Sequence, residues 1–242
     1  MLLSPLTIFK ESWQITRTNY KSFLKVILWL LPPTLGLVFL NLINQKTGFQ
    51  FLNYSVPTSL FLTALSFIIG LWVQIVLIKL IGSSLSQEAV DPKKLYRDSW
   101  RDTAPFLWIN ILASLLVFVG FLLFLVPGFI FIFWYFFAPY AFVLDNKRGY
   151  AALQKSKELV QGRFWAVVWR IFLPNLIYGA IAAILILIPS LPLGIATHFS
   201  TFVRFYNTTP WWFDAWQTLV MLFTLPLTIG FGVILYHNLK EK

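Results

Sequence analysis

Long uncharged stretches alternate with short charged ones along the whole chain. One of them, residues 103–144, is long enough to cross a bilayer twice, because a single crossing takes ~20 apolar residues. A Pro127-Gly128 pair stands at the centre of its most apolar part, residues 121–137, and predicts a tight turn between two membrane helices. The full pattern predicts six spans, at residues 22–43, 58–81, 103–126, 128–144, 162–188 and 211–238.

Individual residues refine this picture of the spans. The fourth span gives only ~25 Å of helix, which is short for a full crossing. Pro32-Pro33 predicts a kink within the first span, and Pro174 predicts an interruption of the fifth. Lys79 ends the second span, where its ammonium group can snorkel to the headgroups. The connection at residues 193–210 carries apolar residues at helical spacing and predicts a further interfacial helix.

The stretches ahead of the three span pairs predict amphipathic surface helices. In residues 1–21, Ser4 is the expected N-cap with proline in the first helical position, and Asp91 followed by proline repeats that start. The third helix falls within residues 145–161. The apolar side of the first helix is predicted to hold Leu6, Phe9, Trp13, Thr16 and Tyr20, and that of the third Tyr150, Leu153 and Val160. Such helices lie in the headgroup plane or pack on the protein's own charged face, and the sequence leaves both open.

An internal repeat underlies these starts. Ser4-Pro-Leu-Thr-Ile-Phe-Lys-Glu-Ser-Trp13 aligns without a gap on Asp91-Pro-Lys-Lys-Leu-Tyr-Arg-Asp-Ser-Trp100. A looser third copy, Ala152-Leu-Gln-Lys-Ser-Lys157, has lysine in place of the tryptophan. We therefore predict a single all-α membrane domain, residues 1–242, built as a pseudo-repeated bundle of three units at about 1–81, 82–144 and 145–242. Chance similarity between basic amphipathic helices is the alternative.

Composition and charge place the chain in a membrane and orient it. Only 12% of the 242 residues are charged, against about 25% in a soluble domain. The net charge is +10, and with six spans every Lys and Arg except Lys46 and Arg204 falls on the side that holds both termini. The positive-inside rule makes that side cytoplasmic. We therefore expect an integral protein of a bacterial inner (plasma) membrane whose basic face meets anionic membrane lipids.

The chain lacks the residue patterns that enzymes and metal sites need. It has no cysteine and two histidines, so thiol chemistry is excluded and a His-based metal site is not expected. It has no glycine-rich phosphate loop, no His-Glu zinc pattern and no nucleophile elbow. Groove-reading motifs are missing too, so the positive charge does not indicate nucleic acid. We expect no catalytic residue, no cofactor, no metal and no nucleic-acid partner.

Polar side chains inside the spans are functional candidates, because they are costly in a bilayer. The intramembrane candidates are Gln74, Asn110 and Asn175, whose structural role would be a hydrogen bond between helices. Arg170 is either a snorkelling cation or a ligand of lipid phosphate. The candidate contacts to lipid headgroups are Trp13, Arg17, Lys93, Lys94, Trp100, Arg163 and Arg170.

Several motifs in the middle of the chain match a known pattern. They are Pro127-Gly128, Ala138-Pro139 ahead of Val143-Leu-Asp145, Gly149-Tyr-Ala-Ala-Leu-Gln-Lys-Ser156 and Leu159-Val-Gln-Gly-Arg-Phe-Trp165. With these motifs, residues 122–165 resemble the multi-span membrane domain attached to some bacterial glycerophosphodiester phosphodiesterases, and its stand-alone relatives. The fused enzymes carry acidic and His catalytic residues in a soluble barrel, for which we expect no room here. The resemblance implies a membrane module and not phosphodiesterase activity.

These observations favour one function over two others. The leading hypothesis is a non-catalytic membrane module that associates with lipid, or with a protein partner, at the cytoplasmic leaflet. The alternative is a transporter of a small or lipidic solute, which the threefold repeat and the proline-containing spans suggest. An intramembrane lipid enzyme is the third hypothesis.

Overall fold

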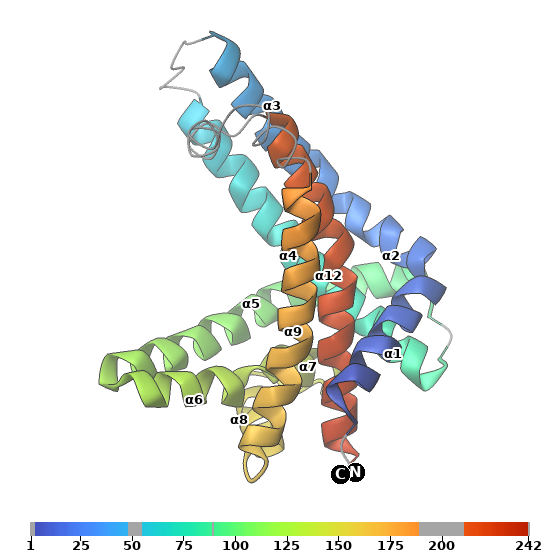
Figure 1. Ribbon diagram of the computed structural model, residues 1–242, viewed down its shortest axis with the longest axis vertical. Helices are drawn as coiled ribbons and strands as arrows, with labels where there is room; N and C mark the ends of the chain where they lie inside the picture. Colours follow the sequence, from blue (N-terminus) through green and yellow to red (C-terminus); the bar gives the residue numbers. More distant parts are fainter. Residues whose placement is uncertain (1–2, 48–54, 89, 189–210, 242) are drawn as a thin grey trace.

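The computed structural model describes residues 3–47, 55–88, 90–188 and 211–241 (Figure 1). Across these ranges the chain forms helices and turns and no strand. In the same ranges six segments are long and apolar enough to cross a membrane, namely Tyr20–Leu40, Val56–Ser86, Pro92–Leu123, Leu125–Asp145, Phe164–Leu187 and Trp212–Lys240. The chain is an all-α integral membrane protein, as the sequence predicts.

The first unit has an irregular first span. Its elements are α1 (Pro5–Thr18), α2 (Tyr20–Ile27), the 3₁₀ turn η1 (Leu28–Leu30), α3 (Leu31–Thr47) and α4 (Ser55–Ser86). The predicted cap of α1 is confirmed, because the Ser4 hydroxyl accepts a 3.2 Å hydrogen bond from the Thr7 backbone N–H. The 3₁₀ turn ends just ahead of Pro32-Pro33, whose rings oppose a regular α-helix in the preceding turn. The irregularity expected in this span is therefore present.

Helix α1 packs on the rest of the protein through the side that carries Ile8 and Ser12. Ile8 and Ser12 are fully buried, whereas Leu6, Trp13 and Tyr20 are each about half exposed. The predicted apolar side is therefore divided: Leu6 and Trp13 face outward, whereas Phe9 packs against the core and stacks on Tyr178 of the fifth span, with the ring centres 5.1 Å apart. In the corresponding helix of the third unit, Leu153 and Val160 are buried as predicted. Tyr150 is 74% exposed, so its predicted place on the packed side is wrong: it is the first residue of its helix and extends past the packed turns.

The second unit departs from the predicted boundaries. Its elements are α5 (Pro92–Leu123), α6 (Leu125–Tyr135) and α7 (Ala138–Asp145). Asp91 caps α5 as predicted, but the surface helix and the third span form one continuous helix instead of two. The fourth span is divided, because the helix is interrupted at Phe136 and Phe137. Its second part, α7, is mostly buried. The whole segment from Leu125 to Asp145 has 21 residues, so the predicted span was short because its start was placed at residue 128.

The turn between α5 and α6 lies at Phe124, not at Pro127-Gly128. Phe124 is extended (φ −166°, ψ 159°), and Pro127 falls in the first turn of α6, where its missing N–H costs no hydrogen bond. Gly128 serves close packing: a Cβ built on Gly120 of α5 would lie 3.0 Å from the Gly128 Cα. The predicted turn was wrong because Gly128 allows close contact between two helices and does not form a turn.

The third unit follows its predicted boundaries more closely. Its described elements are α8 (Tyr150–Val160), α9 (Phe164–Leu187) and α12 (Trp211–Lys240). Pro174 lies inside a continuous α9, so the predicted interruption is wrong: the bend that a proline imposes is accommodated without ending the helix. The predicted interfacial helix at residues 193–210 lies outside the described residues.

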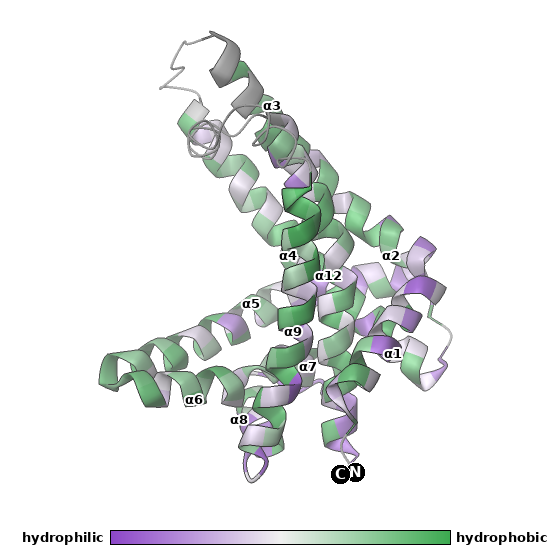
Figure 2. Cartoon of the chain, in the orientation of Figure 1, coloured by the Kyte–Doolittle hydropathy of each residue, from purple (hydrophilic) through white to green (hydrophobic). Residues whose placement is uncertain are grey.

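The three helical hairpins extend from a common base. In Figure 1, α3/α4 and α9/α12 extend upward and α5/α6 extends to the left, while α1, α7 and α8 lie toward the end that holds both termini. Hydrophilic residues gather on this base, and the hairpins are largely hydrophobic (Figure 2). Leu3 N–H donates 3.1 Å to the Asn238 side-chain oxygen, which ties the beginning of the chain to its last helix.

Buried serines mark the contacts between units. Among the described residues, the buried polar side chains are Ser12, Ser99 and Ser156, which are the serines of the three repeat copies. Ser12 Oγ donates to the Leu227 carbonyl on α12, and Ser156 Oγ donates to the Trp134 carbonyl at the end of α6. Each surface helix thus packs on the second span of the preceding unit, and the first unit packs on the third. We call these three contacts the seams.

Candidate functional site

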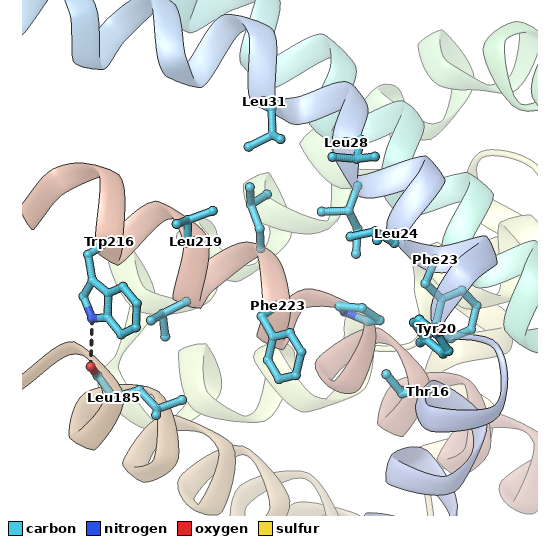
Figure 3. Close-up of a pocket in the computed structure, with 14 residues that line it drawn as sticks. Thr16, Tyr20, Phe23, Leu24, Leu28, Leu31, Leu185, Trp216, Leu219 and Phe223 are labelled. Carbon is cyan, nitrogen blue, oxygen red and sulfur yellow. Dashed lines mark hydrogen bonds between the residues drawn. The ribbon is translucent and has the colours of Figure 1, made fainter. Parts of the chain in front are cut away.

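An apolar groove of about 540 Å³ lies at the seam between the first and third units (Figure 3). One wall is formed by α1, α2, η1 and α3, from Thr16 to Leu31, and the other by α12, from Trp216 to Pro226. At the end far from the base, Trp216 Nε1 donates 2.9 Å to the Leu185 carbonyl of α9. This bond satisfies the indole N–H, so the lining offers almost no hydrogen-bonding group beyond Thr16 and Tyr20 near the base. We call this groove A.

A second groove, of about 630 Å³, lies between the second and third units, and we call it groove B. Its walls are α6, from Val126 to Trp134, and the start of α9, from Phe164 to Val168. Gln161 and Gly162 border it where α8 gives way to α9.

The two grooves are lined by equivalent positions of the repeat. Ser12 and Ser156 are separated by the same number of residues as two pairs of lining residues. In the first pair, Tyr20 lines groove A and Phe164 lines groove B; in the second, Leu24 lines groove A and Val168 lines groove B. On the opposite walls, one constant separation relates the following pairs: Val126 and Leu219, Phe129 and Leu222, Ile130 and Phe223, Phe133 and Pro226. The same separation relates Trp134 to Leu227, the two carbonyls that the serines bond. Lining residues on both walls of the two grooves are therefore related by constant separations in the sequence.

A lysine lies on an aromatic ring at each groove. Lys21 Nζ is 5.9 Å from the ring centre of Tyr20 in groove A, and Lys157 Nζ is 4.5 Å from that of Trp134 in groove B. Two predicted headgroup contacts stand next to lining residues: Arg17 follows Thr16, and Arg163 stands between Gly162 and Phe164. Sequence reasoning missed both lysines, although Lys157 occupies the repeat position of Trp13 and Trp100.

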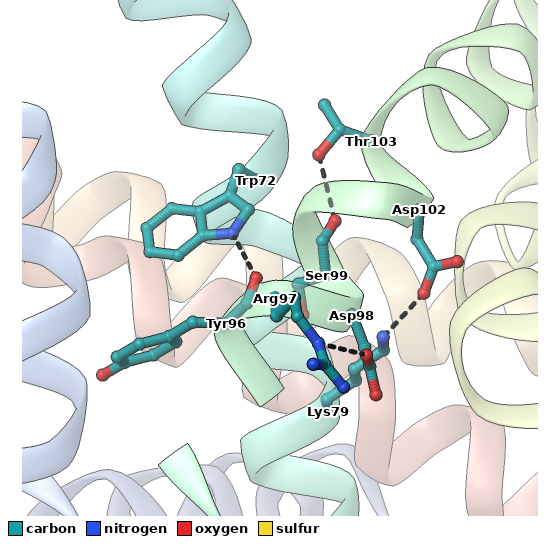
Figure 4. A network of polar contacts seen from close by, with 8 residues as sticks. All are labelled: Trp72, Lys79, Tyr96, Arg97, Asp98, Ser99, Asp102 and Thr103. Atoms are coloured by element: carbon teal, nitrogen blue, oxygen red, sulfur yellow. Dashed lines mark hydrogen bonds and ion pairs between the residues drawn. The ribbon is translucent and has the colours of Figure 1, made fainter. Parts of the chain in front are cut away.

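The seam between the first and second units holds an indole cluster. Trp72 of α4 is buried, and its Nε1 donates 3.2 Å to the Tyr96 carbonyl of α5 (Figure 4). Its ring lies 6.3 Å from that of Trp100. Two turns further along α4, Lys79 pairs with Asp102 at 2.7 Å. Lys79 is thus held by an acidic partner, and its predicted extension to the headgroups is wrong, because α5 brings a carboxylate within reach.

The remaining predicted headgroup contacts differ in their surroundings. Trp13 and Trp100 are 48% and 55% exposed, and Lys93 and Lys94 are exposed in the first turn of α5. Arg170 is turned inward: its Nε donates 2.8 Å to the Leu3 carbonyl and one terminal nitrogen donates 2.8 Å to the Ala166 carbonyl. Its guanidinium therefore secures the N-terminal segment to α9.

The intramembrane amides were predicted to bridge helices, but Asn110 and Asn175 bond within their own helices. Asn110 donates to the Phe106 carbonyl and Asn175 to the Ile171 carbonyl, each at 2.8 Å and each four residues back on its own helix. The helix itself satisfies these amides, so no neighbouring helix is needed. Gln74 is partly buried on α4, and neither it nor Asn175 nor Arg170 lines the grooves described here, whereas Asn110 borders a smaller hollow between α5 and α6.

Asp145 forms a polar link at the base. Its two carboxylate oxygens accept hydrogen bonds of 2.8 Å from the Tyr236 hydroxyl and from Lys240 Nζ, so the end of α7 is joined to the end of α12. Within the described part of the chain, no three His, Asp or Glu residues are grouped so as to hold a metal ion.

Comparisons with protein-family models, with curated proteins and with solved structures found no match to this chain. The resemblance to the phosphodiesterase membrane domain therefore stays a prediction, and the function has to be argued from the geometry.

Proposed function

We propose that this protein is a non-catalytic membrane module that associates with anionic lipid at the cytoplasmic leaflet, with both termini in the cytoplasm. The observation that carries the proposal is the base itself. Helices α1 and α5 carry exposed cations and half-exposed indoles. Hydrophilic residues gather at the base of three otherwise apolar hairpins (Figure 2). Indoles favour the membrane–water interface, and each Lys or Arg near an anionic surface contributes about 1 kcal/mol.

The grooves support lipid association better than transport of a polar solute. Both open beside the base and both have apolar walls, which suit hydrocarbon. A polar solute would need polar groups along its route, and the intramembrane candidates Gln74, Asn175 and Arg170 do not line these grooves. A transporter of a polar solute is therefore the less favoured function.

Quenching of the intrinsic tryptophan fluorescence tests the lipid preference. The protein is reconstituted into mixed vesicles in which either phosphatidylglycerol or phosphatidylcholine carries brominated chains at the same mole fraction. We expect stronger quenching by the brominated anionic lipid, and we expect the difference to shrink as salt screens the base. Equal quenching by the two lipids would refute the proposed function. A reporter fused after Lys242 that is active only outside the cytoplasm would refute the orientation.

A further inference from the structure

We propose that grooves A and B are two equivalent phospholipid sites, each taking an acyl chain between two units and an anionic headgroup on Lys21 or Lys157. The inference deepens the proposed function and rests on it. It turns a general preference of the base for anionic lipid into two defined sites with a fixed stoichiometry.

The length of groove A matches one leaflet. The wall from Tyr20 to Leu31 extends for about 16 Å, and the wall from Trp216 to Pro226 for about 15 Å, at the rise of an α-helix. Half of the ~30 Å hydrocarbon core of a bilayer is ~15 Å. The groove begins beside the base and is bounded at its far end by the Trp216–Leu185 bond. An acyl chain of a lipid in the leaflet at the base therefore fills it from end to end.

The headgroup, and not the chain, has to provide the selectivity. An acyl chain gains little on leaving the bilayer for an apolar groove, because lipid tails are as apolar as leucine side chains. The cation at the mouth of each groove provides the attraction that selects an anionic lipid. Lys21 and Lys157 are held over Tyr20 and Trp134, rings that themselves line the grooves, and Arg17 and Arg163 adjoin lining residues. The ammonium group at each mouth matches the phosphate and net negative charge of an anionic phospholipid.

Native mass spectrometry of the whole protein, purified with phosphatidylglycerol, counts the sites. We expect two lipids to be retained by the unmodified protein and one by Leu24→Trp or Val168→Trp, which fill equivalent positions of grooves A and B. The double variant should retain none. Leu35→Trp and Leu176→Trp add the same indole to exposed positions of α3 and α9 outside the grooves, and should still retain two. Thermal unfolding of every variant shows that the fold is kept.

Charge removal tests the headgroup contact separately. Lys21→Gln or Lys157→Gln should weaken phosphatidylglycerol binding at its own groove about fivefold, and phosphatidylcholine binding little, since one interfacial charge is worth about 1 kcal/mol. Lys10→Gln removes an exposed cation of α1 that is on no groove-lining ring, and should leave both sites unchanged.

The outcomes separate this inference from the proposed function. Unchanged lipid counts in the groove-filling variants, or equal weakening by Lys10→Gln, would overturn the two sites while the quenching preference of the base persisted. Loss of that preference in the unmodified protein would overturn both.

Discussion

The Ser12 hydroxyl donates a hydrogen bond of 2.8 Å to the backbone carbonyl of Leu227, which joins the first helix of the chain to the last. The approach is close because position 230 is glycine: a Cβ there would lie 2.9 Å from the Ser12 oxygen. Ser156 occupies the same place at the next seam, where it donates to the Trp134 carbonyl and also accepts the Phe137 N–H at 3.0 Å. Ser99 is equally buried, but its hydroxyl has no partner among the described residues.

These different bonding states predict a graded response to alanine. Ser156→Ala leaves the Phe137 N–H unpaired in a buried place and should lower the free energy of unfolding by about 1–3 kcal/mol. Ser12→Ala removes one net hydrogen bond and should cost about 1 kcal/mol. Ser99→Ala removes an unpaired hydroxyl and should be neutral or stabilising. Titration with denaturing detergent measures all three, and equal costs would contradict the assigned bonding.

The contact between α5 and α6 predicts a strong effect at Gly120. In Gly120→Ala the new methyl group would lie 2.8 Å from the Phe131 ring and 3.0 Å from the Gly128 backbone, which cannot move aside as a side chain can. We expect a loss of about 1–3 kcal/mol from overpacking. Gly179→Ala on α9 is the control, because its methyl group meets open space; it should stabilise the protein by up to about 1 kcal/mol.

The Lys79–Asp102 pair predicts a measurable coupling energy. The side chains are 21% and 25% exposed and 2.7 Å apart, so water screens them less than a surface pair. A double-mutant cycle with Lys79→Ala and Asp102→Ala should give a coupling of about 1–2 kcal/mol. The same cycle on Arg97 and Asp98, which are 3.7 Å apart and more exposed, should give less than about 0.5 kcal/mol. A coupling no larger than this for the first pair would show that it is broken in the membrane.

Asp145 predicts an unequal effect of its two partners. Tyr236 is buried, so Tyr236→Phe loses a hydrogen bond to a carboxylate and should cost about 1.5–3 kcal/mol. The Lys240 side chain is half exposed, and Lys240→Ala should cost less than about 1 kcal/mol. Thermal unfolding of both variants at one salt concentration provides the comparison. A larger loss from the lysine variant would show that charge, and not the buried hydroxyl, holds α7 to α12.

The sequence predicts the elements with local signals and mispredicts those that tertiary contact decides. Ser4 and Asp91 cap helices because a side-chain oxygen next to a proline needs nothing beyond its own turn. Pro127-Gly128 has turn composition, yet the structure uses Gly128 for close packing against Gly120. A single sequence does not distinguish these two uses of glycine.

The site was predictable only in part, because its lining comes from distant segments. Arg17 and Arg163 were singled out as cations of the base, but nothing local in the sequence indicates that Leu24 faces Phe223 across a groove. The amphipathic pattern is also only partly reliable in a membrane, because Leu6 and Trp13 of the predicted apolar side face outward and the fully buried residues of α1 are Ile8 and Ser12. The repeat was the signal in the sequence that could have been used. Aligning Ser12 with Ser156 also aligns Tyr20 with Phe164, and these two residues line grooves A and B.

Helix α1 has consequences for the order of assembly. Hydrogen bonds join Leu3, just ahead of α1, to Arg170 and Asn238, and Ser12 of α1 to Leu227; these three partners leave the ribosome long after α1 itself. While the first two hairpins insert, the nascent helix therefore has no partner to pack on, and the side that carries Ile8 stays exposed. Its outward indole and cations can hold it on the cytoplasmic headgroups during that interval. When α12 inserts, it packs against α1, completes the contact between the first and third units, and fixes the position of the first helix.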